Sequence, residues 1–146
     1  MLLLNSFSIK EYIIILFLLV KVFRDIKELD IKGETVVTTG TFDGVHIGHQ
    51  HVIKSLIHSA KKNNCESVLL TFDPHPRIVL QQNTDLKLLS SLEEKIELLE
   101  DSGIDNLLII PFTKEFSRMT SLEFVREIIV NPYFLNIRFQ KMWFMV

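Results

Sequence analysis

A strand, a glycine-rich turn, a helix and a second strand follow one another between residues 35 and 72, and this order constrains the fold most. Thr35 to Thr39 (TVVTT) is β-branched throughout, which is typical of a short buried strand. Apolar residues recur at helical spacing beyond Gly48, and Ser67 to Phe72 (SVLLTF) is a second apolar strand. Because a helix joins the two strands, they are expected to pair in parallel. The pattern predicts a βαβ unit.

The same alternation of strands and helices continues along the chain. Two helix starts carry a capping box, a hydroxyl residue followed three positions later by Glu, namely Ser91 with Glu94 and Thr120 with Glu123. The first opens a predicted helix over residues 92–102, and Gly103 follows where a helix ends. Leu107 to Ile110 is a third apolar strand, and a last helix is predicted over 122–130. The fold class predicted from this order is α/β, a doubly wound parallel sheet.

Three segments do not follow this alternation. Residues 74–89 have no clear periodicity and are predicted to be a functional loop. Residues 131–146 (NPYFLNIRFQKMWFMV) match neither a further strand–helix unit nor a linker, and we treat them as a non-matching tail. Residues 1–20 form an apolar leader, for which a membrane anchor is one interpretation. We favour the alternative, an upstream extension of a domain that begins near Lys21.

Charge and cysteine usage exclude some classes of partner. Sixteen basic and eighteen acidic residues give a formal charge of −2, and no basic tract stands out, so nucleic acid is not an expected partner. Membrane binding is not expected either. The single cysteine, Cys65, cannot form an internal disulfide, which favours a reducing, cytoplasmic setting.

The segment from Thr39 to His49 (TGTFDGVHIGH) is the first candidate site. It joins a strand to a helix, and ligands of open α/β sheets bind beyond the carboxyl ends of the strands. A helix N-terminus offers free N–H groups and partial positive charge to an anion. His46 and His49 are three residues apart, so both imidazoles can face one side. These features predict a phosphate pocket, in which Gly48 leaves room for a base or ribose.

A metal pair is the alternative interpretation of the two histidines. Asp43 could add a third ligand, but a dedicated zinc site usually needs more. The density of glycines around the histidines also has no explanation in a metal site. We therefore predict no metal site formed by protein ligands.

Two segments carry a resemblance to a known family. His46-Ile47-Gly48-His49 resembles the motif of the HxGH nucleotidylyltransferases, and residues 40–49 (GTFDGVHIGH) look like the bifunctional riboflavin kinase/FMN adenylyltransferase family. Residues 71–77 (TFDPHPR) are similar to a strand-end loop that forms part of that family's flavin site. From its residues alone, the second segment could also be a plain turn. The resemblance covers residues 21–130.

The resemblance implies a Rossmann-like doubly wound parallel sheet of the HxGH nucleotidylyltransferase type. It also implies the transfer of AMP from ATP, taken with Mg²⁺, to FMN, giving FAD and pyrophosphate. The implied catalytic residues are His46 and His49, the ATP-binding residues are Gly40, Thr41, Phe42, Asp43 and Gly48, and the flavin-binding residues are Phe72, Asp73, His75 and Pro76.

Several segments that the family carries find no match in this sequence. They are a further strand with a glycine-rich aromatic segment, a Ser-Ser-Thr…Arg motif and a riboflavin kinase domain. We therefore expect residues 21–130 to be a partial adenylyltransferase domain, incomplete at its C-terminus and impaired in activity. The alternatives are a non-catalytic nucleotide-binding fragment, or a cytidylyltransferase or pantetheine-phosphate adenylyltransferase, against which residues 72–76 argue.

Overall fold

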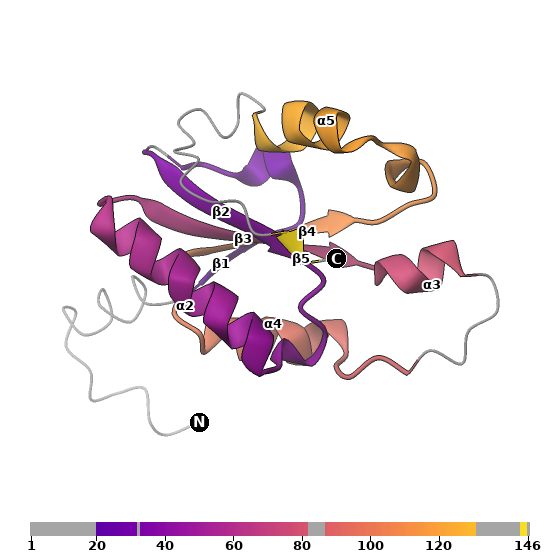
Figure 1. Cartoon of the computed structure of the whole chain (residues 1–146), viewed down its shortest axis with the longest axis horizontal. Helices are drawn as coiled ribbons and strands as arrows, with labels where there is room; N and C mark the ends of the chain where they lie inside the picture. Colours follow the sequence, from indigo (N-terminus) through magenta and orange to yellow (C-terminus); the bar gives the residue numbers. More distant parts are fainter. Residues whose placement is uncertain (1–19, 32, 82–86, 131–143, 146) are drawn as a thin grey trace, which may run out of the picture.

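A parallel sheet with helices on both faces organises the chain (Figure 1). The computed structural model describes residues 20–31, 33–81, 87–130 and 144–145. The strands are β1 (Lys21–Phe23), β2 (Thr35–Gly40), β3 (Glu66–Asp73), β4 (Asn106–Pro111) and β5 (Phe144–Met145). Their order in the sheet is β1-β4-β3-β2-β5, and each neighbouring pair is parallel.

Helices cover the two faces of the sheet in the doubly wound manner that the sequence predicts. Helices α2 (Ile47–Lys62) and α4 (Leu92–Glu100) lie on one face, and α5 (Ser121–Phe124), which continues as the π-helical turn η4 (Val125–Ile129), lies on the other (Figure 1). The shorter elements are α3 (Pro76–Leu80) and the 3₁₀ turns η1 (Ile26–Glu28), η2 (Asp43–Val45) and η3 (Phe116–Arg118).

Two hydrophobic layers hold the helices to the sheet. Because side chains alternate along a strand, neighbouring residues of β2 serve opposite layers, with Val36 facing α2 and α4 and Val37 facing the other side. The first layer contains Val36, Ile53, Leu56, Ala60, Leu69, Leu99, Leu107 and Ile109. The second contains Leu29, Val37, Val68, Leu70, Leu108, Ile110 and Ile129. Strands that are buried on both faces explain the continuous apolar runs in the sequence.

The predicted capping boxes are confirmed. The Ser91 hydroxyl accepts from the Glu94 amide at 3.2 Å, and the Ser91 amide donates to the Glu94 carboxylate at 2.8 Å. Thr120 and Glu123 make the same reciprocal pair at 3.2 and 2.7 Å. Each box satisfies backbone groups that a helix start leaves without partners.

Three expectations need correction. The predicted loop over residues 74–89 contains helix α3, because His75 caps it and Pro76 occupies its first position. Strand β1 was not predicted, since three residues at the sheet edge give too short a pattern. The tail was assigned no element, yet Phe144–Met145 pairs with Thr39 and Gly40 of β2.

The apolar leader cannot be assessed in the same way. Residues 1–19 lie outside the described residues, so neither interpretation of the leader is tested. Among the residues that are described, no helix has the length and apolar character needed to cross a membrane.

The core layer under α2 and α4 yields a test of the fold. Leu107 is fully buried there, so Leu107→Ala should lower the free energy of unfolding by about 2–5 kcal/mol, measured by urea unfolding. Leu122→Ala is the matched control, because that side chain is 67% exposed and its loss should change little. Similar losses in both variants would contradict the described core.

Candidate functional site

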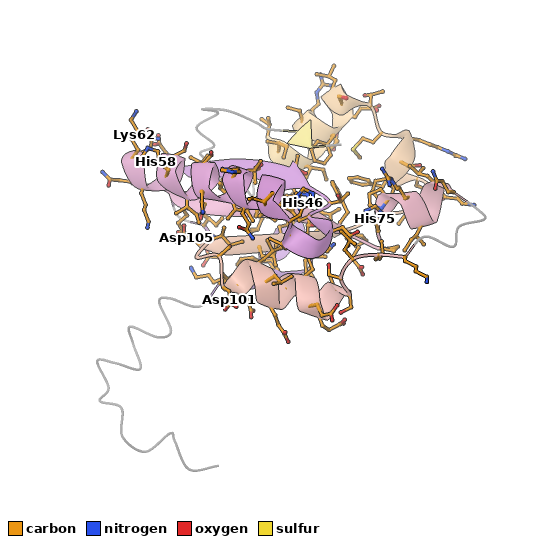
Figure 2. All side chains as sticks on the ribbon, turned by 60° about the horizontal axis from the view of Figure 1, so that its bottom comes forward. His46, His58, Lys62, His75, Asp101 and Asp105 are labelled. Carbon is orange, nitrogen blue, oxygen red and sulfur yellow. The ribbon has the colours of Figure 1, made fainter. Side chains whose placement is uncertain are left out.

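The carboxyl ends of β2 and β3 bring both candidate motifs to one edge of the sheet. The two strands are parallel neighbours, with Thr39 opposite Leu70, so the turn after β2 and the loop after β3 leave the sheet together. The Thr71 hydroxyl donates to the Thr41 carbonyl at 3.1 Å and joins the two segments directly. Figure 2 shows His46 and His75 toward the same end of the molecule, with His58 at the other end of α2.

The turn after β2 adopts backbone conformations that few sequences allow. Phe42 and Val45 have positive φ values of 50° and 40°, and Gly44 has a φ of 66°. At Gly44 a Cβ atom would also lie 2.8 Å from the Leu89 Cβ, so glycine is needed there twice over. Strained backbone of this kind clusters at functional sites, which agrees with the predicted role of the turn.

Asp43 anchors this turn to the start of α4. Its carboxylate accepts from the amides of Leu89 at 2.9 Å and Ser90 at 3.1 Å. The Gly44 amide donates to the Ser90 hydroxyl at 3.0 Å and completes the link. The Asp43 carboxylate, which was predicted to contact ATP, therefore also has a structural role, since its oxygens already accept hydrogen bonds from the protein.

His46 and His49 form a stacked pair at the start of α2. Their ring centroids are 3.6 Å apart with 22° between the planes, as the three-residue spacing predicts. His46 is exposed and occupies the N-cap position, without a side-chain capping bond, whereas His49 is 6% exposed. Gly48 keeps this pair close, because a Cβ there would lie 3.2 Å from the His46 ring.

Burial favours the neutral form of His49. Its pKa is lowered below the ordinary value of 6.5, mainly by burial and then by the charge of His46; Asp43 opposes the shift and Lys95 adds to it. The Nδ1 atom of His49 has no hydrogen-bond partner among the described residues, although it is buried. A buried polar atom without a partner is unusual and is consistent with a site that binds a ligand.

Phe42 differs from its predicted position beside the nucleotide. Its side chain is fully buried, and its ring centroid lies 5.1 Å from that of His49. Gly40 makes room for this ring, because a Cβ at Gly40 would lie 3.0 Å from it. The aromatic side chain thus packs against the His49 ring from inside the protein.

The loop after β3 presents His75 next to a short helix. Asp73 ends β3, the Asp73–Pro74 peptide bond is cis, and Pro76 begins α3. The His75 Nδ1 atom accepts from the Arg77 amide at 3.1 Å. The pKa of His75 is lowered, mainly by burial, with Asp43 opposing and Lys95 and Arg77 adding to the shift. An accepting Nδ1 leaves the proton of the neutral ring on Nε2.

An aromatic cluster that no sequence motif indicated lies beside this loop. Phe72 contacts the rings of Phe112, Phe116 and Phe124 at centroid distances of 5.6, 5.7 and 6.4 Å. All four side chains are only partly buried. The signal that could have found the cluster is positional, since Phe112 directly follows β4, the strand that neighbours β3.

The described residues do not form a protein-held metal site. No group of three or more His, Cys, Asp or Glu side chains within residues 20–31, 33–81, 87–130 and 144–145 could hold a metal ion.

Comparisons with known proteins identify the family of the chain. The profile of a family described as FAD synthetase matches residues 28–137. A bifunctional riboflavin kinase/FMN adenylyltransferase of Buchnera aphidicola (subspecies Schizaphis graminum) is 36% identical over 120 residues, 82% of this chain and 38% of the relative. The protein of the same name from Listeria monocytogenes is 40% identical over 96 residues, 65% of this chain and 31% of the relative. The chain spans less than two fifths of the length of these curated relatives.

A solved structure supports the fold. It is described as a macrolide-efflux protein from Streptococcus pneumoniae and superposes with a TM-score of 0.67 at 25% sequence identity, covering 82% of this chain and 39% of that one. The shared architecture is the helix-covered parallel sheet described above.

The lowered pKa values of His49 and His75 predict a pH dependence of stability. As pH falls below about 6.5, the unfolded chain takes up protons at these positions before the folded chain does, so the free energy of unfolding falls. Above that pH both rings are neutral in the folded and the unfolded chain, so the free energy of unfolding should have its full value. Urea unfolding at pH 7.5 and 5.5 measures the difference.

The contribution of one imidazole can be isolated. His49→Gln should show a smaller loss of stability between the two pH values than the parent chain, because one such group is gone. His58→Gln is the matched control, since His58 is exposed on the same helix. An equal change of slope in both variants would contradict the role of burial at His49.

Proposed function

The chain belongs to the FAD synthetase family, and we propose that its domain performs the FMN adenylyltransferase step. In that step AMP passes from ATP to FMN, giving FAD and pyrophosphate. The observation that carries the proposal is the stacked His46–His49 pair at the N-terminus of α2, at the same sheet edge as the loop after β3 and the aromatic cluster around Phe72. The names of the relatives support the choice of FMN over the acceptors of cytidylyltransferases and pantetheine-phosphate adenylyltransferases.

The ATP side of the site would be the turn after β2. A terminal phosphate oxygen of FMN would attack the α-phosphorus of ATP, and the bond from that phosphorus to the pyrophosphate oxygen would break. His46 and His49, stacked at the start of α2, would donate hydrogen bonds to phosphate oxygens as charge develops on them. The free N–H groups at the start of α2, with the backbone of Gly40, Thr41 and Gly48, would add to this stabilisation. No covalent enzyme intermediate is needed.

The flavin side of the site would be the loop after β3 and the aromatic cluster. Phe72 and its partners are only partly buried, and planar aromatic ligands bind well to aromatic surfaces. His75 and Pro76 would border the flavin from α3, and Asp73 would border it from the end of β3. Both sites then lie at the shared carboxyl edge of β2 and β3, where the FMN phosphate could reach ATP.

Mg²⁺ is proposed as a companion of ATP rather than as a resident of the protein. The described residues provide no cluster of ligands for it, and the Asp43 carboxylate already accepts backbone amides. The ion would enter on the triphosphate oxygens, where it would offset their charge. We propose a cytoplasmic setting from the lone cysteine, and neither nucleic acid nor membrane as a partner.

Nucleotide binding tests the ATP side of the proposal. His46→Ala should weaken the binding of MgADP about tenfold or more, because a hydrogen bond to a charged group is worth about 1.5–3 kcal/mol. Titration calorimetry measures the affinity. His58→Ala is the matched control at the opposite end of α2. Affinity that is unchanged by His46→Ala would refute the assignment of the turn.

FAD formation tests the reaction. The chain should convert FMN to FAD with ATP and not with CTP, and His49→Gln should lower the rate about 10²–10³-fold through the loss of transition-state stabilisation. Chromatography of the flavins under single-turnover conditions detects even the low rate that is expected of a partial domain. Binding of MgADP without any FMN-dependent FAD would instead favour a non-catalytic nucleotide-binding domain.

A further inference from the structure

Lys95 is a buried lysine at the centre of the site that no sequence motif had singled out. It lies on α4 and is 5% exposed, although lysine is almost never fully buried unless it has a partner. Its Nζ atom donates to the carbonyl oxygen of Phe72 at 3.5 Å, near the end of β3. Its helix also packs against η2, the turn that follows β2. One side chain therefore lies close to both candidate motifs.

Two carboxylates act on this ammonium group, but neither is close enough to form an ion pair with it. Asp73 and Asp43 act on Lys95 electrostatically from the two loops. Neither carboxylate, however, forms an ion pair with Lys95 within 4.0 Å; in the described part of the chain the pair at that distance is Lys21 with Glu66. An ammonium has three N–H donors, and one of them is accounted for by Phe72. Such a cation is costly to bury for packing alone.

We infer that Lys95 is a positioning residue for the transfer reaction, which fixes the separation between the turn after β2 and the loop after β3. The inference rests on the proposed function, because the two segments are the proposed ATP and flavin sites. Asp43 already ties the first segment to the start of α4 through Leu89 and Ser90. Lys95, one turn further along α4, ties the second segment to the same helix through Phe72.

The charge of Lys95 also acts on both imidazoles of the site. It lowers the pKa of His49 and that of His75, in each case after the larger effect of burial. The other charged groups that act on His49 are His46 and Asp43, and those that act on His75 are Asp43 and Arg77. The pKa of Lys95 is itself lowered by burial, while Asp73 and Asp43 favour its charged form. Lys95 thus adds to the preference of both rings for their neutral, hydrogen-bonding form.

Two substitutions separate the charge of Lys95 from its packing. Lys95→Met keeps an unbranched apolar stem of similar length and removes the charge, whereas Lys95→Arg keeps the charge. Lys62→Met, at the exposed end of α2, is the matched control for the loss of a positive charge. Thermal unfolding of each full-length variant shows whether it folds.

The decisive measurement is the titration of the histidine rings by NMR in the full chain without ligands. Lys95→Met should raise the titration midpoints of both His49 and His75, and Lys95→Arg should restore them toward the parent values. His51 and His58, which line a hollow against β2, are internal controls in the same spectra. A side chain that only packs would not move the titration midpoints of two rings on different segments in the same direction.

Kinetics provide the second arm. Lys95→Met should lower kcat for FAD formation about 10²-fold, because a misplacement of about 1 Å can cost that much, while the affinity for MgADP changes less. Midpoints of His49 and His75 that stay at the parent values in folded Lys95→Met would overturn the inference. The titration does not depend on catalysis. If the parent chain formed no FAD, that result would count against the proposed function, and the titration would still test Lys95.

Discussion

The parallel pairing of β2 with β3 is the constraint on which the site depends. A parallel ladder places the carboxyl ends of both strands at one edge, so two segments that are about thirty residues apart in the sequence begin side by side. The helix between them must then start at that edge, with its free N–H groups directed toward it. Loss of this register by one residue would turn Val36 and Val37 to the wrong layers and would separate the histidines from the loop after β3.

The sequence predicts the parts of this arrangement whose signals are local. The β-branched run of β2, the helical spacing of α2 and the two capping boxes each depend on neighbours within a few residues, and all are confirmed. The stacking of His46 on His49 follows from their spacing for the same reason. Elements that need distant partners were missed: β1 is three residues long and exists because β4 pairs with it.

The site shows the same division between local and distant information. Asp43 was expected to contact the nucleotide, but its carboxylate accepts amides 46 and 47 positions away. Phe42 was expected to border the nucleotide, and its ring packs against that of His49 in the interior. Lys95 stands among four glutamates in α4, where a solvent-exposed position would be expected, and only the tertiary structure shows that it is buried. Motif positions locate a site, whereas tertiary contacts decide what each side chain does there.

The stacked imidazoles have a consequence for proton balance. Burial opposes protonation of His49, and positive charge on His46 opposes it further, so His49 favours its neutral form. A polyanion placed against the rings would reverse that preference and draw protons from the solvent. Association would then carry the ionisation heat of whatever buffer supplies them, and its apparent enthalpy would vary between phosphate and Tris while the number of protons taken up stayed the same. The rings would thereby link the occupancy of the pocket to the acidity of its surroundings.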